Sequence, residues 1–128
     1  GPTDFLGASH AQFFGASRTH AFANQSGRCF YCGMPMWADN PQEFANQHGF
    51  TPGQAKRFQC TGEHLVARKD GGSSARSNIV AACRFCNEVR HKRKNPLPPD
   101  RYRLLVRNRM KLGRWHGLWA SQKGLLSN

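Results

Sequence analysis

Residues 60–87, which read CTGEHLVARKDGGSSARSNIVAACRFCN, decide the fold of this chain. Two short segments on either side of the Gly- and Ser-rich stretch 70–74 predict strands at 58–65 and 78–83, the second rich in Ile and Val. From residue 86 to about 94 the chain favours a helix, which a downstream Asn-Pro pair ends. The sequence therefore predicts a strand, a loop, a second strand and a helix in direct succession.

Four of the five cysteines form two Cys-x-x-Cys pairs, Cys29 with Cys32 and Cys83 with Cys86. Two residues between thiolates let both sulfurs of a pair reach one tetrahedral Zn²⁺ at about 2.3 Å, and two pairs complete its shell. A disulfide framework suits a secreted chain better, and a redox Cys-x-x-Cys needs no second copy. We therefore predict a structural zinc site, with Cys60 as a small buried apolar residue outside it.

The composition limits the partners of the chain. Its 128 residues carry a formal net charge of +12, which favours a polyanion and makes nucleic acid the leading partner class. The longest apolar run, residues 79–83, is far shorter than the ~18 residues of a membrane span. No secretion signal is recognisable at the start. We expect a DNA-binding protein without a membrane partner, in the reducing, intracellular environment of the cytoplasm.

Four features of this region, taken in order, resemble the HNH nucleases of the His-Me finger, or ββα-metal, superfamily. They are an acidic residue before a histidine (Glu63-His64), a Gly-rich loop, Asn78 before an apolar strand, and a second cysteine pair that runs into Asn87. The resemblance covers about residues 28–94. It implies an α+β fold, a small zinc-stapled ββα-metal finger with additional helices, and metal-dependent endonuclease activity.

The resemblance also implies roles for individual residues. His64 is the general base, Glu63 and Asn87 hold one catalytic Mg²⁺ or Mn²⁺, and Asn78 holds the loop that carries His64. Hydrolysis of a phosphodiester needs such a base and such a cation. His91, one helical turn after Asn87, is a further metal ligand or a phosphate contact.

Each of these residues also has an ordinary structural interpretation. His64 is one of six histidines, Asn78 suits a turn, and Asn87 suits the cap of a helix. Glu63 stands where the family more commonly has Asp, and its extra methylene shifts the carboxylate oxygens unless the backbone adjusts. Consecutive residues on a strand point to opposite sides, so Glu63 and His64 can act together only where the strand ends or twists.

A basic segment follows the predicted metal site. Residues 84–114 contain eleven Lys or Arg against two acidic residues, a pattern that suits either a solvated face or contacts with DNA phosphates. The predicted contacts with duplex DNA are Arg90, Lys92, Arg93, Lys94, Arg103, Arg107, Lys111 and Arg114.

Three regions are predicted along the chain. Residues 1–27 form an N-terminal arm, helical or partly ordered, in which Phe5, Phe13, Phe14 and Phe22 pack on the body. Residues 28–95 form the nuclease core, with a helical insertion at 40–58 whose two helices begin after Asn40 and Thr51. Residues 96–128 form a basic helix capped by Asp100, and a tail that Trp115 and Trp119 anchor to the core.

The sequence therefore predicts a metal-dependent DNA endonuclease with His64 as general base. One alternative is a zinc-dependent nucleic-acid-binding module without catalysis, which leaves Glu63, His64, Asn78 and Asn87 without a common explanation. Another is the nuclease domain of a larger restriction, phage or toxin protein.

Overall fold

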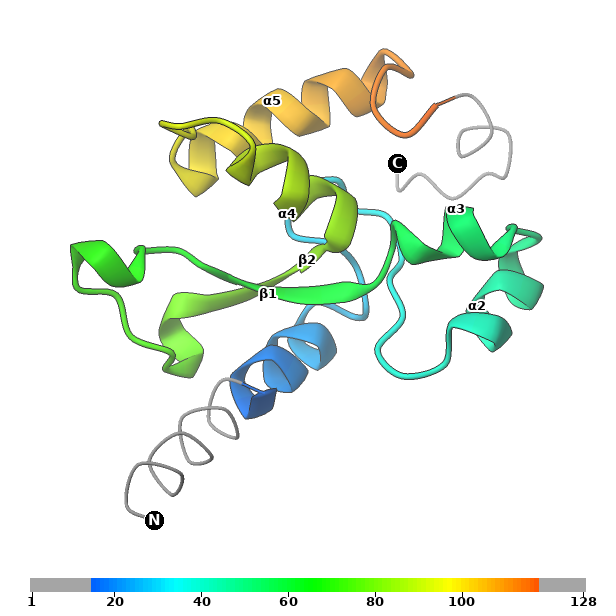
Figure 1. Cartoon of the computed structure of the whole chain (residues 1–128), viewed down its shortest axis with the longest axis horizontal. Coiled ribbons are helices and arrows are strands. Elements are labelled where there is room, and N and C mark those ends of the chain that lie inside the picture. Colours follow the sequence, from blue (N-terminus) through cyan, green and yellow to red (C-terminus); the bar gives the residue numbers. More distant parts are fainter. Residues whose placement is uncertain (1–14, 118–128) are drawn as a thin grey trace.

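The computed structural model describes residues 15–117, and its centre is a two-stranded antiparallel sheet (Figure 1). Strand β1 (Cys60–His64) pairs with β2 (Ile79–Cys83) in the register Glu63 opposite Val80. Helix α4 (Arg84–His91) follows β2 without a connecting loop. The predicted strand, loop, strand and helix are confirmed, with strands shorter than expected and a helix that starts two residues earlier.

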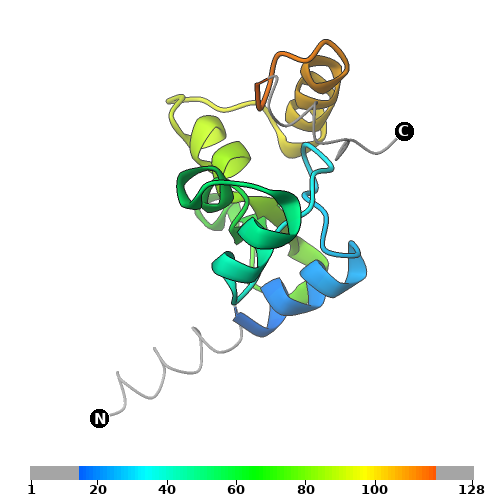
Figure 2. The same cartoon turned by 90° about the vertical axis from the view of Figure 1, so that its right-hand side faces the viewer.

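The sheet lies between two helical layers (Figures 1 and 2). Helix α4 covers one face, and residues 15–24, which are helical, lie along the other. Ala21 and Phe22 of that segment pack in or against the core, as predicted for Phe22. The buried Ser17 hydroxyl donates to the Ser74 carbonyl at 2.7 Å and so ties the segment to the loop between the strands. The remaining aromatic residues predicted to pack, Phe5, Phe13, Phe14 and Trp119, lie outside the described residues.

The insertion between the two cysteine pairs forms the two predicted short helices. Helix α2 (Pro41–His48) is capped by the Asn40 side chain and ends at Gly49, whose φ of 69° is left-handed. Helix α3 (Pro52–Lys56) begins at a capping box in which Thr51 and Gln54 bond reciprocally. The predicted helix starts after Asn40 and Thr51 are confirmed, because local side-chain caps determine them.

Helix α5 (Pro99–Lys111) crosses the molecule above α4 (Figure 1). Tyr102, Val106 and Met110 form its buried face. The predicted cap is wrong, since the helix starts after Pro98 and Asp100 lies in its first turn. A proline at the first helical position has no N–H to satisfy, which allows the earlier start.

The chain between β1 and β2 contains two turns of 3₁₀ helix, η1 (Arg68–Asp70) and η2 (Arg76–Asn78). Gly72 lies between them, where a Cβ would stand 1.8 Å from the Val66 carbonyl oxygen. Only glycine fits so close to another backbone segment. Among residues 15–117, no helix is long and apolar enough to cross a bilayer.

Candidate active site and metal centre

The two cysteine pairs meet in one buried cluster. The sulfurs of Cys29, Cys32, Cys83 and Cys86 all lie within 4.8 Å of one another. The Cys32 and Cys83 sulfurs are 3.9 Å apart, close to the ~3.8 Å between two ligands of a tetrahedral ion with Zn–S bonds of about 2.3 Å. All four cysteines are free thiols, so the donor set and its spacing fit the predicted zinc.

Backbone amides point at the sulfurs of this cluster. The Cys29 sulfur accepts from the N–H groups of Tyr31 at 3.3 Å, Cys32 at 3.4 Å and Cys83 at 3.2 Å. Burial alone would raise the pKa of the Cys29 thiol, but hydrogen bonds from the other three cysteines outweigh burial and lower it. A thiolate, the form that binds a metal, is therefore favoured at Cys29, whereas burial raises the pKa of the Cys83 and Cys86 thiols.

Residues of the C-terminal segment close the cluster from outside. The Trp115 indole N–H donates to the Cys86 sulfur at 3.2 Å, and its ring packs edge-on against Phe85. This confirms Trp115 as an anchor of the tail. With four protein ligands and this cover, a bound ion would have no open position for a substrate, which suits a structural role.

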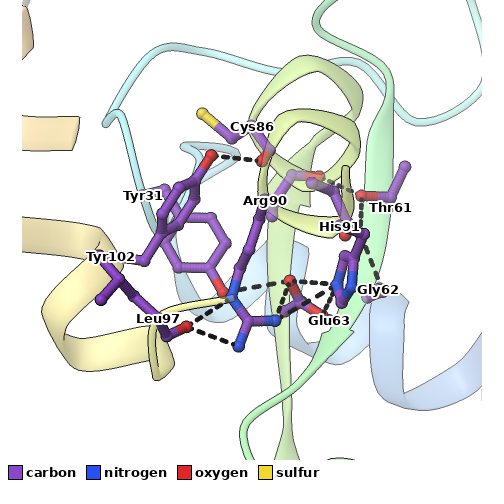
Figure 3. Close-up of polar contacts among 11 residues, drawn as sticks. Tyr31, Thr61, Gly62, Glu63, Cys86, Arg90, His91, Leu97 and Tyr102 are labelled. Carbon is purple, nitrogen blue, oxygen red and sulfur yellow. Dashed lines mark hydrogen bonds and ion pairs between the residues drawn. The ribbon is translucent and has the colours of Figure 1, made fainter. Parts of the chain in front are cut away.

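Glu63 lies near the C-terminal end of α4, beside Arg90 and His91, where its carboxylate is buried with only 5% of the residue exposed. Its Oε2 accepts from the Tyr31 hydroxyl at 3.1 Å and from Arg90 Nη1 at 3.2 Å. Its Oε1 lies 3.0 Å from Nε2 of His91 (Figure 3). The structure therefore brings together two of the predicted catalytic-metal ligands, Glu63 and His91.

Arg90 is buried, whereas the sequence pattern predicts an exposed side chain. We expect a contact with DNA phosphates there, but the residue is only 9% exposed, and its guanidinium pairs with Glu63 and donates to the Leu97 carbonyl at 2.9 and 3.1 Å. A guanidinium taken out of water needs such partners. Arg90 is thus part of the framework of the site and is not free to bind a phosphate.

His64 ends strand β1 and opens onto the same groove as Glu63. The groove has a volume of 760 Å³, and His91 lines it as well. His64 Nε2 lies 3.4 Å from the Ser74 hydroxyl. Both residues line this groove, although they are successive paired residues of β1, with Glu63 opposite Val80 and His64 opposite Ile79.

Asn78 makes the loop contacts that were predicted for it. Its side-chain oxygen accepts from the Val66 N–H at 2.8 Å, and its amide donates to the carbonyls of Val66 at 3.0 Å and Ser73 at 2.7 Å. Its own carbonyl accepts from Leu65, the residue after His64, at 2.8 Å. Asn78 therefore holds the backbone on both sides of the loop.

Asn87 lies in the interior of α4, because the cap of that helix is Cys83. Its amide nitrogen donates to the Thr61 hydroxyl at 3.0 Å and to the Gly62 carbonyl at 3.4 Å. With His91 it lines a second hollow of 460 Å³ beside the groove. The helix-cap interpretation is thus wrong. The amide oxygen is the atom through which Asn87 would bind a cation.

Four exposed basic residues line the groove. Two of them, Arg93 and Lys94, are predicted contacts, and two, Arg68 and Lys69 of η1, are missed by the sequence reasoning. The overlooked signal is their position between His64 and the Gly-rich loop, which keeps them near the site. A groove with cations along it and Glu63, His64 and His91 inside it suits a phosphate chain.

Helix α5 is less available for DNA than its charge pattern indicates. Arg107 turns inward, where its Nε donates to the Tyr31 carbonyl at 2.6 Å and its guanidinium packs against Gly33. Arg103 lies over the Phe30 ring at 4.5 Å. Arg107 is half-buried and partly occupied by these contacts, so its phosphate contact stays a prediction, while Lys92, Lys111 and Arg114 are exposed.

Comparison with known proteins supports the resemblance. Residues 53–93 match the family model described as HNH endonuclease, a segment that runs from α3 through both strands and α4. No curated protein and no solved structure matches the chain.

Proposed function

We propose, from the HNH endonuclease domain that residues 53–93 carry, that this protein is a metal-dependent DNA endonuclease that hydrolyses phosphodiester bonds. The observation that carries the proposal is the groove that Glu63, His64 and His91 all line, together with exposed basic side chains. A family match supports nuclease activity in general. The groove supports the catalytic roles given to individual residues and the choice of DNA as substrate. The proposed setting is intracellular.

His64 acts as the general base. Imidazole titrates near neutrality and can take a proton from water at physiological pH. When Nε2–H donates to the Ser74 hydroxyl, Nδ1 is the basic nitrogen that accepts this proton. Asn78 keeps the loop after His64 in place, so the ring stays directed at the groove.

Glu63, His91 and Asn87 are the residues that would hold the catalytic cation. Two neighbouring ligands of an octahedral ion with bonds of about 2.1 Å lie about 3.0 Å apart. The distance from Glu63 Oε1 to His91 Nε2 is 3.0 Å, which matches that separation, and Arg90 Nη1 lies 3.3 Å from the same nitrogen. A bound Mg²⁺ or Mn²⁺ would neutralise charge on the phosphoryl group and the leaving oxygen.

The groove walls position the DNA. Arg68, Lys69, Arg93 and Lys94 are exposed beside the proposed catalytic residues, where contacts with phosphates fix a duplex without reading its sequence. Their charge also concentrates a polyanion at the site.

Incubation of the purified chain with supercoiled plasmid tests the proposal. We expect relaxed or linear product with Mg²⁺ or Mn²⁺ and none with excess EDTA, because the groove cation is held by few ligands and is easily removed. Fragment ends that carry a 5′-phosphate and a 3′-hydroxyl would match the expected hydrolysis. DNA binding without cleavage under every metal condition would instead support the zinc-dependent binding module.

A further inference from the structure

We propose that Tyr31 is a positioning residue that couples the cysteine cluster to Glu63 in the groove. Tyr31 lies between Cys29 and Cys32 in the sequence. Its hydroxyl donates to the carboxylate of Glu63, which belongs to strand β1 (Figure 3). The inference rests on the proposed function, because it takes Glu63 to be a ligand of the catalytic cation.

Three contacts fix Tyr31 in place. Its backbone N–H donates to the Cys29 sulfur at 3.3 Å, and its carbonyl accepts from Arg107 of α5 at 2.6 Å. Its ring has 0% exposure and packs edge-on against Tyr102, with centroids 4.7 Å apart. The main chain of Tyr31 is therefore tied to a zinc ligand and to α5, which leaves its hydroxyl little freedom to move.

The hydroxyl sets the orientation of the carboxylate. Tyr31 and Arg90 both donate to Oε2 of Glu63, and His91 Nε2 lies 3.0 Å from Oε1 and 3.2 Å from Oε2. A carboxylate held by two donors on one oxygen presents the other oxygen in a defined direction. Without the hydroxyl, Arg90 would be the main donor to Oε2, and the carboxylate could rotate away from His91. Hydrogen-bonding partners of metal ligands commonly tune affinity in this way.

Tyr102 provides a matched control for the loss of a buried tyrosine hydroxyl. Its hydroxyl donates to the Cys86 carbonyl at 2.7 Å, so it also contacts the second cysteine pair. It is buried and packs against Tyr31, but its hydroxyl bonds the cysteine side and not Glu63. Tyr31→Phe and Tyr102→Phe thus remove the same group, and only the first removes a contact with the carboxylate.

Calorimetric titration of the zinc-loaded full chain with Mn²⁺, in the absence of DNA, tests the inference. We expect Tyr31→Phe to weaken Mn²⁺ affinity at least about tenfold, with zinc content unchanged. Tyr102→Phe should bind Mn²⁺ like wild type. Glu63→Gln should lose the binding. In cleavage assays, Tyr31→Phe should require more Mn²⁺ for half-maximal rate and recover most of its rate at saturating Mn²⁺.

The outcomes separate this inference from the proposed function. If Tyr31→Phe binds Mn²⁺ as wild type does while Glu63→Gln loses it, the coupling is wrong and the metal site stands. If Tyr102→Phe weakens Mn²⁺ as much as Tyr31→Phe, the effect passes through packing near the cysteines, and the hydroxyl has no special role. If wild type binds no Mn²⁺, the coupling and the proposed catalytic site both fail.

Discussion

The two candidate metal sites of this protein differ in how they are enclosed. The cysteine cluster is buried on all sides, with four thiols, backbone N–H donors and Trp115 around it. The groove is open, and Glu63 is its deeply buried member beside the half-buried His64 and the exposed His91. A closed set of ligands can stabilise the fold, while an open one leaves room for substrate and water.

The largest expected effect is at the closed site. Cys83→Ser removes one of four ligands and also alters the cap of α4, so we expect an unfolded or aggregated protein without zinc. Zinc analysis and thermal unfolding measure this directly. A stable, cooperatively folding Cys83→Ser variant would show that the cluster does not maintain the fold.

The charges around the open site should govern DNA affinity. Changing three groove residues to Gln should lower the magnitude of the slope of log K against log salt by roughly 2.7, at about 0.9 per phosphate contact. The groove residues are Lys69, Arg93 and Lys94.

A control set of two Lys and one Arg has the same charge and does not line the groove: Lys56, Lys111 and Arg114. The control variant should keep most of the slope. If it loses more than the groove variant, DNA follows α5 instead, as the charge pattern of the sequence predicts.

Acid should destabilise the aromatic packing around His116. His116 packs between Phe58 and Phe85, and neither ring nitrogen has a hydrogen-bond partner among the described residues. Burial, with a smaller contribution from the charge of Arg57, lowers its pKa to about 3.

Because this pKa is below the value in the unfolded chain, the free energy of unfolding is highest above about pH 6.5. It decreases as the pH falls toward 3, since the unfolded chain binds a proton that the folded one does not. The free energy of unfolding should be about 2 kcal/mol lower at pH 5 than at pH 7. Denaturant unfolding of wild type and His116→Leu at pH 7 and pH 5 measures it, and the variant should lose less. Equal losses would show that His116 is not the acid-sensitive group.

The smallest expected effect concerns the identity of the groove cation. Imidazole is a poorer ligand for Mg²⁺ than for Mn²⁺, so His91 should make Mn²⁺ bind more tightly. His91→Ala should reduce this preference by about tenfold in the ratio of the two dissociation constants. Titrations with both ions measure the ratio, and an unchanged ratio would exclude His91 as a ligand.

Local signals made much of this structure predictable. The cysteine spacing predicted the cluster, the caps at Asn40 and Thr51 predicted two helices, and Asn78 makes the loop contacts that the resemblance implied. Each of these features depends on residues that are close in sequence, or on metal ligands whose geometry is strict.

The sequence did not predict which charged side chains turn inward. Arg90 and Arg107 lie in a basic run that suits a solvated face, yet one pairs with Glu63 and the other holds the Tyr31 carbonyl. The bond from Tyr31 to Glu63 was also missed, since it joins residues 32 positions apart. Such contacts depend on how helices pack, which periodicity alone does not specify.

The most direct test of the central claim compares wild type with His64→Ala on supercoiled plasmid in Mn²⁺, with zinc content and DNA affinity measured on the same samples. The variant should cleave at least ~10² times more slowly, because the general base acts on the transition state, while zinc content and DNA affinity stay at the wild-type level. Cleavage by His64→Ala at the wild-type rate would contradict the account and show that the groove is not the catalytic site.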